Sequence, residues 1–358
     1  MDKKDLIPLS ASRIKTAQNC SWTYFCKYVL KLPDTSNEGA SKGWICHLIF
    51  ELLGDDKHKK HLKKVLKNRS VYSSVALKRL VEIHANKLGV NYKGALVDMD
   101  KMILKGLNYD FFGDILEKPL QAISEQDFDL IVDEKDKKYR IKGFIDKLFI
   151  YKDTALIRDF KTSKEVFKGK EITDNLQDLM YSLAVQKMFP KQKNRNCEFL
   201  FLRFPLDKDL TGNHGKGVLK MDSISDEELE GFEYHLTEIS NYLNDFSETK
   251  ALSNLAAKKP YPSDGSFGGP LSCGREGFKK SRGEFVLDEN GNKIPSYICP
   301  FRKPMSYYTL VDENGKIKKT AFLKDKDSLV KLKEKNDQII KEEYSGCPHW
   351  NKKDEFDI

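Results

Sequence analysis

Apolar residues recur with a helical period over the first third of the chain. Residues 9–30 predict a short helix, a break at Cys20 and a second helix rich in aromatic residues. An apolar helix follows at 44–53, and 72–118 shows the pattern of two or three amphipathic helices. We therefore expect a helical N-terminal region at 1–125.

The period changes to that of β-strands at about Phe128. Residues 128–132 and 139–141 have the composition of strands joined by a charged turn, and two more apolar runs follow them. A helix from Thr173 to Phe189 and a buried strand at 198–204 come next. The pattern ends in an edge strand at 216–221 and an amphipathic helix at 226–246. This order predicts a mixed α/β core over 126–250, a sheet flanked by helices.

Two carboxylates and a lysine interrupt the apolar runs between residues 143 and 161. If Lys152–Asp153 is a two-residue hairpin loop, paired positions sum to 305, and Asp146 and Asp159 become cross-strand neighbours. Lys161 shares their face because side chains alternate along a strand. Neighbouring carboxylates on an apolar face repel each other, and a divalent cation between them would reverse that cost. The alternative is a surface hairpin with ordinary salt bridges.

The apolar helix at 44–53 carries a second pair of polar residues. His47 and Glu51 are four positions apart and share one helix face, which favours a functional site over a core histidine. The G-x-S-x-G match at 39–43 is rejected as a nucleophile elbow, because a polar loop precedes it where a buried strand is required. The basic run 57–69 is expected to be a solvated helix face, with phosphate contact as the alternative.

The last hundred residues differ in composition, and we expect them to form a separate extension at 251–358. Asp-Glu-Asn-Gly occurs at 288–291 and again at 312–315, and Asn-Gly is a strong hairpin signal. Residues 324–344 predict a charged helix.

The composition of the 358 residues fits a globular protein, with 39% hydrophobic residues and a net charge of +8. That charge suggests an anionic partner without identifying nucleic acid. No apolar run is long enough to cross a membrane, and the first residues lack a secretory signal, so we expect a cytoplasmic protein with no membrane partner. Seven cysteines, an odd number, argue against a disulfide framework. Cys26, Cys46 and Cys197 lie in apolar runs and are expected to be core thiols.

Four short motifs occur in a fixed order. They are Gly-x-x-x-His at 43–47, Gly-x-x-Asp at 143–146, Asp-x-Lys-Thr at 159–162 and Gln-x-x-x-Tyr at 177–181. Together they resemble the PD-(D/E)XK nuclease superfamily, most closely its RecB-like branch of helicase-nuclease exonuclease domains and CRISPR-adaptation exonucleases. The resemblance covers roughly residues 9–205. It implies a restriction-endonuclease-like mixed central sheet flanked by helices.

The resemblance also implies a metal site. His47, Asp146 and Asp159 would be the side-chain ligands, helped by the carbonyl of Phe160. Carboxylate oxygens suit Mg²⁺ or Mn²⁺, and the imidazole tilts the expectation slightly toward Mn²⁺.

The same resemblance assigns catalytic roles to four further side chains. Lys161 would position the attacking water or stabilise the charged phosphate, and Glu51 would hold a metal-bound water. Gln177 and Tyr181 would orient the site and the DNA strand.

Several members of the branch hold a 4Fe–4S cluster with one N-terminal and three C-terminal cysteines. Cys20 stands where the first would be, and Cys273, Cys299 and Cys347 would be the others, although members usually space the last three tightly. The competing interpretation is Zn²⁺ bound by Cys273, Cys299, Cys347 and His349. A third possibility is that these cysteines bind nothing.

The sequence therefore predicts a metal-dependent deoxyribonuclease, specifically an exonuclease acting on single-stranded DNA or free ends in repair, recombination or phage- or CRISPR-type DNA processing. The alternative is a catalytically silent nucleic-acid-binding module of a repair or recombination complex. A metal-stabilised structural protein with accidental motif matches is a third hypothesis. The sequence has no G-x-x-x-x-G-K-[ST], so a helicase or recombination partner would supply any ATP-driven motion.

Overall fold

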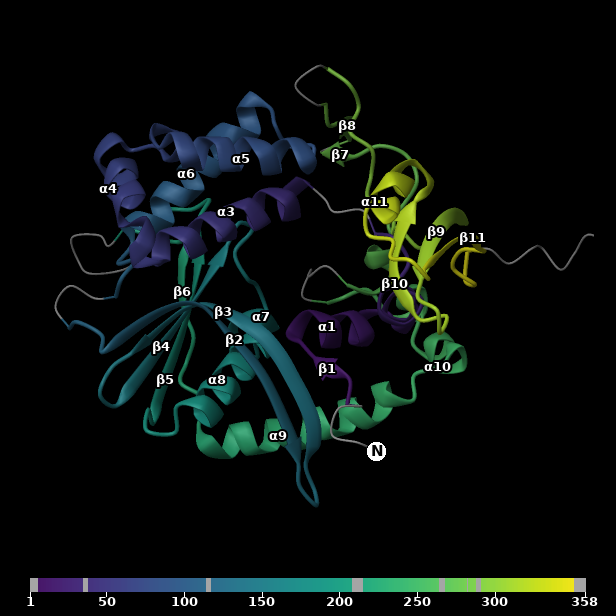
Figure 1. Ribbon diagram of the computed structural model, residues 1–358. Helices are drawn as coiled ribbons and strands as arrows, with labels where there is room; N and C mark the ends of the chain where they lie inside the picture. The colour runs from purple at the N-terminus through teal and green to yellow at the C-terminus, as the bar shows by residue number, and fades with distance from the viewer. Residues whose placement is uncertain are drawn as a thin grey trace, which may run out of the picture. The chain divides into compact units, whose positions relative to one another are not determined.

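The chain forms two compact units in the computed structural model, which describes residues 6–34, 38–113, 117–207, 215–263, 268–281, 283–287 and 291–350 (Figure 1). The first unit comprises Met1–Ala11 and Ser36–Asn241, and the second comprises Ser12–Thr35 and Tyr242–Ile358. Among the described residues, no helix is both long and apolar enough to cross a membrane. The division into three domains at 1–125, 126–250 and 251–358 stays a prediction.

A mixed sheet of six strands forms the centre of the first unit. The strands are β1 Pro8–Leu9, β2 Gln121–Asp133, β3 Lys138–Ile150, β4 Thr154–Lys161, β5 Asn194–Phe201 and β6 Val218–Lys220. The long β3 pairs with β2 along one edge, and on the other edge with β1 at one end and β4 at the other. The pairs β1–β3 and β4–β5 are parallel, and the other pairs are antiparallel. The predicted mixed α/β core is therefore confirmed.

The β3–β4 hairpin has the predicted register. Its four backbone pairs, from Lys147–Arg158 to Ile150–Ala155, all sum to 305, and Lys152–Asp153 form the loop. The ladder stops one residue short of Asp146 and Asp159. These two residues are the next positions in the same register.

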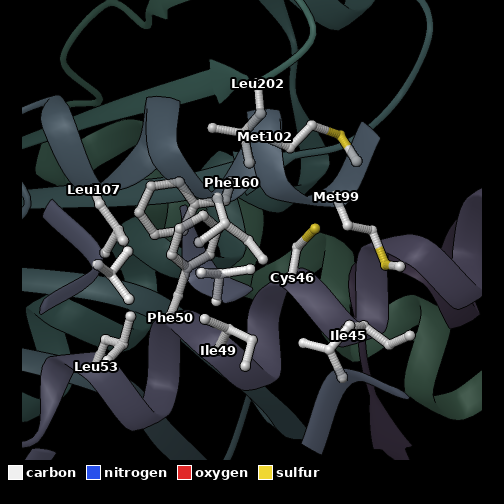
Figure 2. Packing of buried hydrophobic residues seen from close by; sticks show 14 of the residues in the cluster. Ile45, Cys46, Ile49, Phe50, Leu53, Met99, Met102, Leu107, Phe160 and Leu202 are labelled. Carbon is white, nitrogen blue, oxygen red and sulfur yellow. The ribbon is translucent and has the colours of Figure 1, made fainter. Parts of the chain in front are cut away.

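Helices cover both faces of this sheet (Figure 1). They are α3 Glu38–Gly54, α4 Lys59–Asn68, α5 Val75–Lys87, α6 Lys93–Asn108, α7 Lys170–Thr173, α8 Leu176–Met188 and α9 Asp226–Asn244. Figure 2 shows the apolar core that α3 and α6 form with the sheet. There Phe50 of α3 stacks on Phe160 of β4, with 4.3 Å between ring centroids. The next residue back, Asp159, contacts Tyr181 of α8. Because consecutive strand residues point to opposite faces, α3 and α8 lie on opposite sides of the sheet.

The second unit is built from the segment after Ala11 and the C-terminal part of the chain. Its elements are α1 Ala11–Asn19, α2 Ser21–Tyr24, a π-helical turn Phe25–Val29, α10 Glu248–Ser253, the small pair β7 Lys280–Ser281 and β8 Glu284–Phe285, and a sheet of β9 Met305–Val311, β10 Ile317–Phe322 and β11 Gln338–Tyr344. The helix break predicted at Cys20 is confirmed. The Asn-Gly hairpin at 312–315 is confirmed between β9 and β10, whereas residues 288–290 of the other segment lie outside the described residues.

The charged helix predicted at 324–344 is wrong. Within it only the 3₁₀ turn that ends at Asp325 and the short α11, Lys326–Val330, are helical, and Gln338–Tyr344 forms β11, which pairs with β9. The carboxylate of Asp337 accepts a hydrogen bond from the backbone of Glu334 at 2.9 Å and closes a turn before the strand. Ile339 and Ile340 favour the strand that follows, because β-branched side chains fit a pleated surface. The strand gives no alternating apolar pattern in the sequence, because neither face of β11 is buried along its whole length.

The three cysteines predicted to be core thiols are all buried: Cys26, Cys46 and Cys197. Cys46 lies in the core shown in Figure 2.

Candidate active site

A hydrogen-bonded network surrounds Asp159 at the end of β4. Asp159 is only 3% exposed, and its Oδ1 accepts bonds from Gln177 Nε2 at 2.7 Å and from the Tyr181 hydroxyl at 3.1 Å. Its Oδ2 lies 2.7 Å from the Nζ of Lys161. The same Nζ donates to Gln177 Oε1 at 2.7 Å. Four polar side chains from two elements therefore hold one another in a fixed arrangement.

The start of α8 places two members of this network. The side chain of Asn175 caps the helix by accepting a hydrogen bond from the Gln177 backbone at 2.9 Å. The predicted start at Thr173 was three residues too early because this cap was not recognised. Gln177 and Tyr181 follow on one face, four residues apart, where both reach Asp159.

His47 of α3 meets Asp146 of β3. The distance between His47 Nδ1 and Asp146 Oδ1 is 3.1 Å. The other carboxylate oxygen, Oδ2, accepts a hydrogen bond at 2.7 Å from the backbone N–H of Phe160. One oxygen of Asp146 thus accepts a hydrogen bond from the backbone of β4, just past the last backbone pair of the hairpin, and the other oxygen faces His47. The predicted helix and hairpin residues converge.

Two glycines of the sequence motifs permit close contacts around these residues. A Cβ on Gly43 would lie 2.7 Å from Thr162 Oγ1, so α3 packs directly on the residue after Lys161, one turn before His47. A Cβ on Gly143 would lie 2.7 Å from the ring of Phe128, which in turn contacts Tyr181 edge-on at 6.3 Å between centroids.

The sequence model of the PD-(D/E)XK nuclease superfamily matches residues 8–271. The chain belongs to this superfamily. A solved structure titled "Crystal structure of SSO0001" is similar to 51% of this chain and 69% of its own, with 13% identity and a TM-score of 0.24. No curated protein matches the sequence. Membership implies a metal-dependent nuclease with DNA as its substrate class, on a restriction-endonuclease-like fold.

The superfamily's dependence on divalent metal fits the donors present here. Within the described residues, one group of three ligand atoms lies within 4.8 Å of one another, from His47, Glu125 and Asp146. In addition, Asp159 Oδ2 is buried and makes no hydrogen bond within the described part of the chain, although Lys161 is close as a charge. Carboxylate oxygens with one imidazole nitrogen are suitable ligands for Mg²⁺ or Mn²⁺.

Glu125 is the residue that the sequence analysis missed. It lies on β2 between the pairs Ser124–Lys147 and Gln126–Ile145, which places it opposite Asp146. Its φ of +49° is in the left-handed region, which a glutamate rarely adopts. The sequence contained the information needed to find Glu125. If the pairing of the β2–β3 hairpin is extended along both strands, Glu125 lies opposite Asp146. The predicted strands were too short to show it.

Glu51 and Phe160 flank this group. Glu51 is exposed one turn beyond His47, and its charge is one cause of the raised pKa of Glu125. The ring of Phe160 is held between Phe50 and Phe111, which fixes the backbone at this point of β4. The roles predicted for the Glu51 carboxylate and the Phe160 carbonyl stay predictions.

The mutual proximity of these groups shifts their proton affinities. Burial alone would lower the pKa of His47, but the negative charge and hydrogen bond of Asp146 outweigh it and raise that pKa to about 9. Burial, together with the charge of Asp146, raises the pKa of Glu125 to about 7. Burial also raises the pKa of Asp159, against the opposing effect of Lys161. At neutral pH the metal-free site therefore holds protons that a metal ion must displace.

We expect the affinity for Mn²⁺ to rise with pH between 6 and 9. A metal ligand must be unprotonated, and with a pKa of about 9 His47 carries a proton below that pH. Affinity should increase about tenfold per pH unit between 7 and 9, more steeply below 7 where Glu125 also binds a proton, and level off above 9. Calorimetry in buffers of different ionisation enthalpy measures the released protons. Binding that is independent of pH in this range would contradict the assigned ligands.

Gly43→Ala is expected to weaken metal binding about tenfold, the usual cost of disturbing the support of a ligand. The added Cβ would overlap Thr162 Oγ1 and push α3, with His47, away from Asp146. Mn²⁺ titration calorimetry measures the effect. The double variant Gly43→Ala/Thr162→Ala removes the overlapping atom and should recover most of the affinity. Equal weakening by both variants would show that the overlap is not the cause.

Four of the predicted cysteines belong to the second unit, where an apolar cluster gathers them. Cys20 and Cys273 are buried members of this cluster, and Cys299 and Cys347 pack against it. The Cys299 N–H donates to the Cys273 carbonyl at 3.1 Å. Burial raises the pKa of Cys299 to about 11, and the neighbouring charges of Cys20 and Cys273 contribute to the same direction.

The fourth ligand of the zinc alternative, His349, stacks edge-on against Trp350 with 5.0 Å between centroids. Cys26, predicted to be a core thiol, lies in the same apolar cluster as the four cysteines. Its Sγ donates to the Tyr344 hydroxyl at 3.4 Å.

Proposed function

We propose that the protein is a Mg²⁺- or Mn²⁺-dependent DNA exonuclease of the RecB-like branch, acting on single-stranded DNA or free ends. The observation that carries this proposal is the convergence of two polar sets. His47 and Asp146 are 3.1 Å apart, and Asp159 is held by Lys161 and Gln177 at 2.7 Å each. A degenerate binding module would not be expected to keep a full set of ligands around one buried carboxylate.

His47, Asp146 and Asp159 would hold the metal, with the Phe160 carbonyl, and Glu125 would join them. Such a metal, when bound, activates water for attack on a phosphodiester and offsets the charge that develops on the phosphate. Superfamily membership and the spacing of the donors support this assignment.

The remaining residues of the site would orient the Asp159 carboxylate and stabilise the charge on the phosphate. Gln177 and Tyr181 each donate to Asp159 Oδ1 and so fix the orientation of its carboxylate. The Gln177 carbonyl and the Asp159 carboxylate hold the Lys161 ammonium, which would donate to a phosphate oxygen. Glu51, exposed beside this group, would hold a water at its rim.

Cleavage of linear and circular DNA tests the proposal. Purified protein is incubated with end-labelled linear DNA, single- and double-stranded, and with covalently closed circular single strands, in Mn²⁺, Mg²⁺ or EDTA. We expect linear single strands to be degraded, circles to persist, and EDTA to stop the reaction. Cutting of circles at the linear rate would refute the exonuclease. No cutting of any substrate would favour a binding module in its place.

We further propose that Cys20, Cys273, Cys299 and Cys347 hold a 4Fe–4S cluster. A zinc ion needs its thiolates about 3.8 Å apart, from a Zn–S bond of about 2.3 Å. Among the described residues, no three cysteine or histidine ligand atoms of the second unit lie within 4.8 Å of one another. That wider spacing supports the larger cluster over Zn²⁺. The apolar cluster around the four thiols would shield it from solvent.

Metal analysis decides between the two cofactors. Anaerobically purified protein should contain iron and sulfide and absorb visible light, and Cys299→Ser should lose both. Cys46→Ser, which alters a buried thiol of the first unit, is the control that should keep the iron. Stoichiometric zinc without iron would refute the cluster.

The proposed setting is DNA repair, recombination or phage- or CRISPR-type DNA processing in the cytoplasm. A helicase or recombination partner would deliver the unwound strand. Co-purification with a DNA-unwinding activity is the observation to seek.

A further inference from the structure

The second unit contains an open cavity of about 480 Å³ that lies outside the candidate active site. Its lining includes Tyr261, Leu271, Arg275, Lys279, Ser296 and Tyr297. The two tyrosines are 69% and 50% exposed, so both rings are accessible from solvent. A volume of this size is within the range of small-molecule sites.

Backbone pairing beside the cysteines builds one wall of this cavity. Arg275 N donates to the Tyr297 carbonyl at 3.0 Å, and Gly274 bridges Ile298. Gly274 has φ +68°, and a Cβ there would collide with the Tyr297 backbone. Cys273 and Cys299 flank these contacts directly. Backbone contacts next to two of the cysteines therefore hold Arg275 and Tyr297 together.

The cavity presents two cationic side chains, those of Arg275 and Lys279. Within the described residues, neither the Arg275 guanidinium nor the Lys279 ammonium has an acidic partner. By contrast, nearby Lys303 pairs with Glu276 at 2.8 Å. Unpaired cations beside aromatic rings favour a ligand that is both anionic and aromatic.

A polar atom in the wall adds specificity to this chemistry. Ser296 Oγ is buried and has no hydrogen-bond partner in the part of the chain that the structure describes. A buried hydroxyl without a partner costs free energy unless a ligand or water meets it. The edge of a nucleobase offers such a partner, its face can stack on a tyrosine, and its phosphate can meet Lys279 or Arg275.

We propose that this cavity binds a nucleotide unit of a DNA single strand, with Tyr297 and Tyr261 stacking on bases and Arg275 and Lys279 contacting phosphates. The inference rests on the proposed function, because that function makes DNA the substrate. It adds a strand-binding site in the second unit, remote in sequence from every nuclease motif.

Binding of a fluorescently labelled oligothymidylate to the full-length chain tests the proposal. Fluorescence anisotropy is measured in EDTA, which prevents cleavage. Tyr297→Ala should weaken binding about tenfold, the usual cost of one lost stacking contact, while Tyr297→Phe keeps the ring and should bind like the wild type. Lys279→Glu should weaken binding and lower its salt dependence, whereas Lys335→Glu, an exposed lysine of the same unit, should have little effect.

Equal binding by Tyr297→Ala, Lys279→Glu and their controls would overturn the proposal. Displacement of the oligonucleotide by thymidine monophosphate at the same nucleotide concentration would also overturn it, in favour of a free-nucleotide site. Circular dichroism and thermal melting verify that each variant is folded. Cleavage in Mn²⁺ is measured separately. Strand binding without cleavage would refute the nuclease and keep this site. Cleavage by a protein whose Tyr297 and Lys279 variants bind normally would keep the nuclease and refute this site.

Discussion

Asp159→Asn is expected to reduce metal-dependent DNA cleavage at least about a thousandfold, because in the proposed site both the metal and the attacking water would depend on this carboxylate. An asparagine keeps the shape of the side chain and one carbonyl oxygen. It can still accept the hydrogen bond from Tyr181, but it lacks the negative charge that would bind a cation and that now pairs with Lys161 at 2.7 Å. Mn²⁺ affinity and cleavage rate should fall together. Calorimetry and a single-turnover assay measure them.

The same substitution should leave the metal-free protein at least as stable as the wild type. Burial and the charge of Asp146 raise the pKa of Asp159 in the folded state. A carboxyl whose folded pKa is raised loses stability as pH rises from its unfolded pKa through its folded pKa, and asparagine has no such loss. Thermal melting in EDTA at neutral pH tests this.

Asp153→Asn is the matched control for Asp159→Asn, since Asp153 is exposed in the loop at the other end of the same hairpin. It should retain full activity. A strongly destabilised Asp159→Asn would show that the carboxylate serves the fold. Normal cleavage by this variant would remove Asp159 from the site altogether.

Lys161→Met should lower the cleavage rate by a factor of about 10² to 10³ and leave metal binding intact, since removing one donor to a developing charge has an effect of this size. The ammonium now lies between Asp159 and Gln177, and its Nζ is 5.8 and 5.2 Å from the ring centroids of Phe167 and Phe199. Methionine preserves the apolar stem and removes the charge. The cleavage rate at saturating Mn²⁺ separates this effect from metal loss.

Lys164→Met is the control for Lys161→Met, because it removes an exposed lysine three residues further along. If Lys161→Met cleaves at the wild-type rate, the phosphate is stabilised by another group. If it loses Mn²⁺ affinity as well, the prediction is contradicted and Lys161 supports the metal ligands. A titration with Mn²⁺ therefore accompanies every assay.

Local periodicity predicted the parts of this site that lie on regular elements. The two-residue loop at Lys152–Asp153 and strict alternation along both strands were sufficient for the register of Asp146 and Asp159. A helical spacing of four was likewise sufficient for Gln177 and Tyr181, whose common target is Asp159.

Other features depend on interactions that periodicity does not report. Glu125 adopts a left-handed backbone conformation that its residue type disfavours, so only the surrounding strands can impose it. The strand at Gln338–Tyr344 forms because β9 offers an edge, and its own polar residues suggest a helix. The grouping of Cys20 with Cys273, Cys299 and Cys347 depends on a fold that joins distant segments.

The interleaved layout of the two units has a consequence for the order in which they form during translation. The first unit is finished once residue 241 has been synthesised, so it can fold while the rest of the chain is still being made. Residues 12–35 belong to the second unit and must wait for 242–358. At about 5–20 residues per second, synthesis of 242–358 takes roughly 6–23 s, during which Trp22 and Cys26, both buried in the finished protein, have no core to enter. A nascent chain would therefore carry a folded nuclease core beside an exposed apolar segment, a natural target for a chaperone, until Cys347 has emerged from the ribosome.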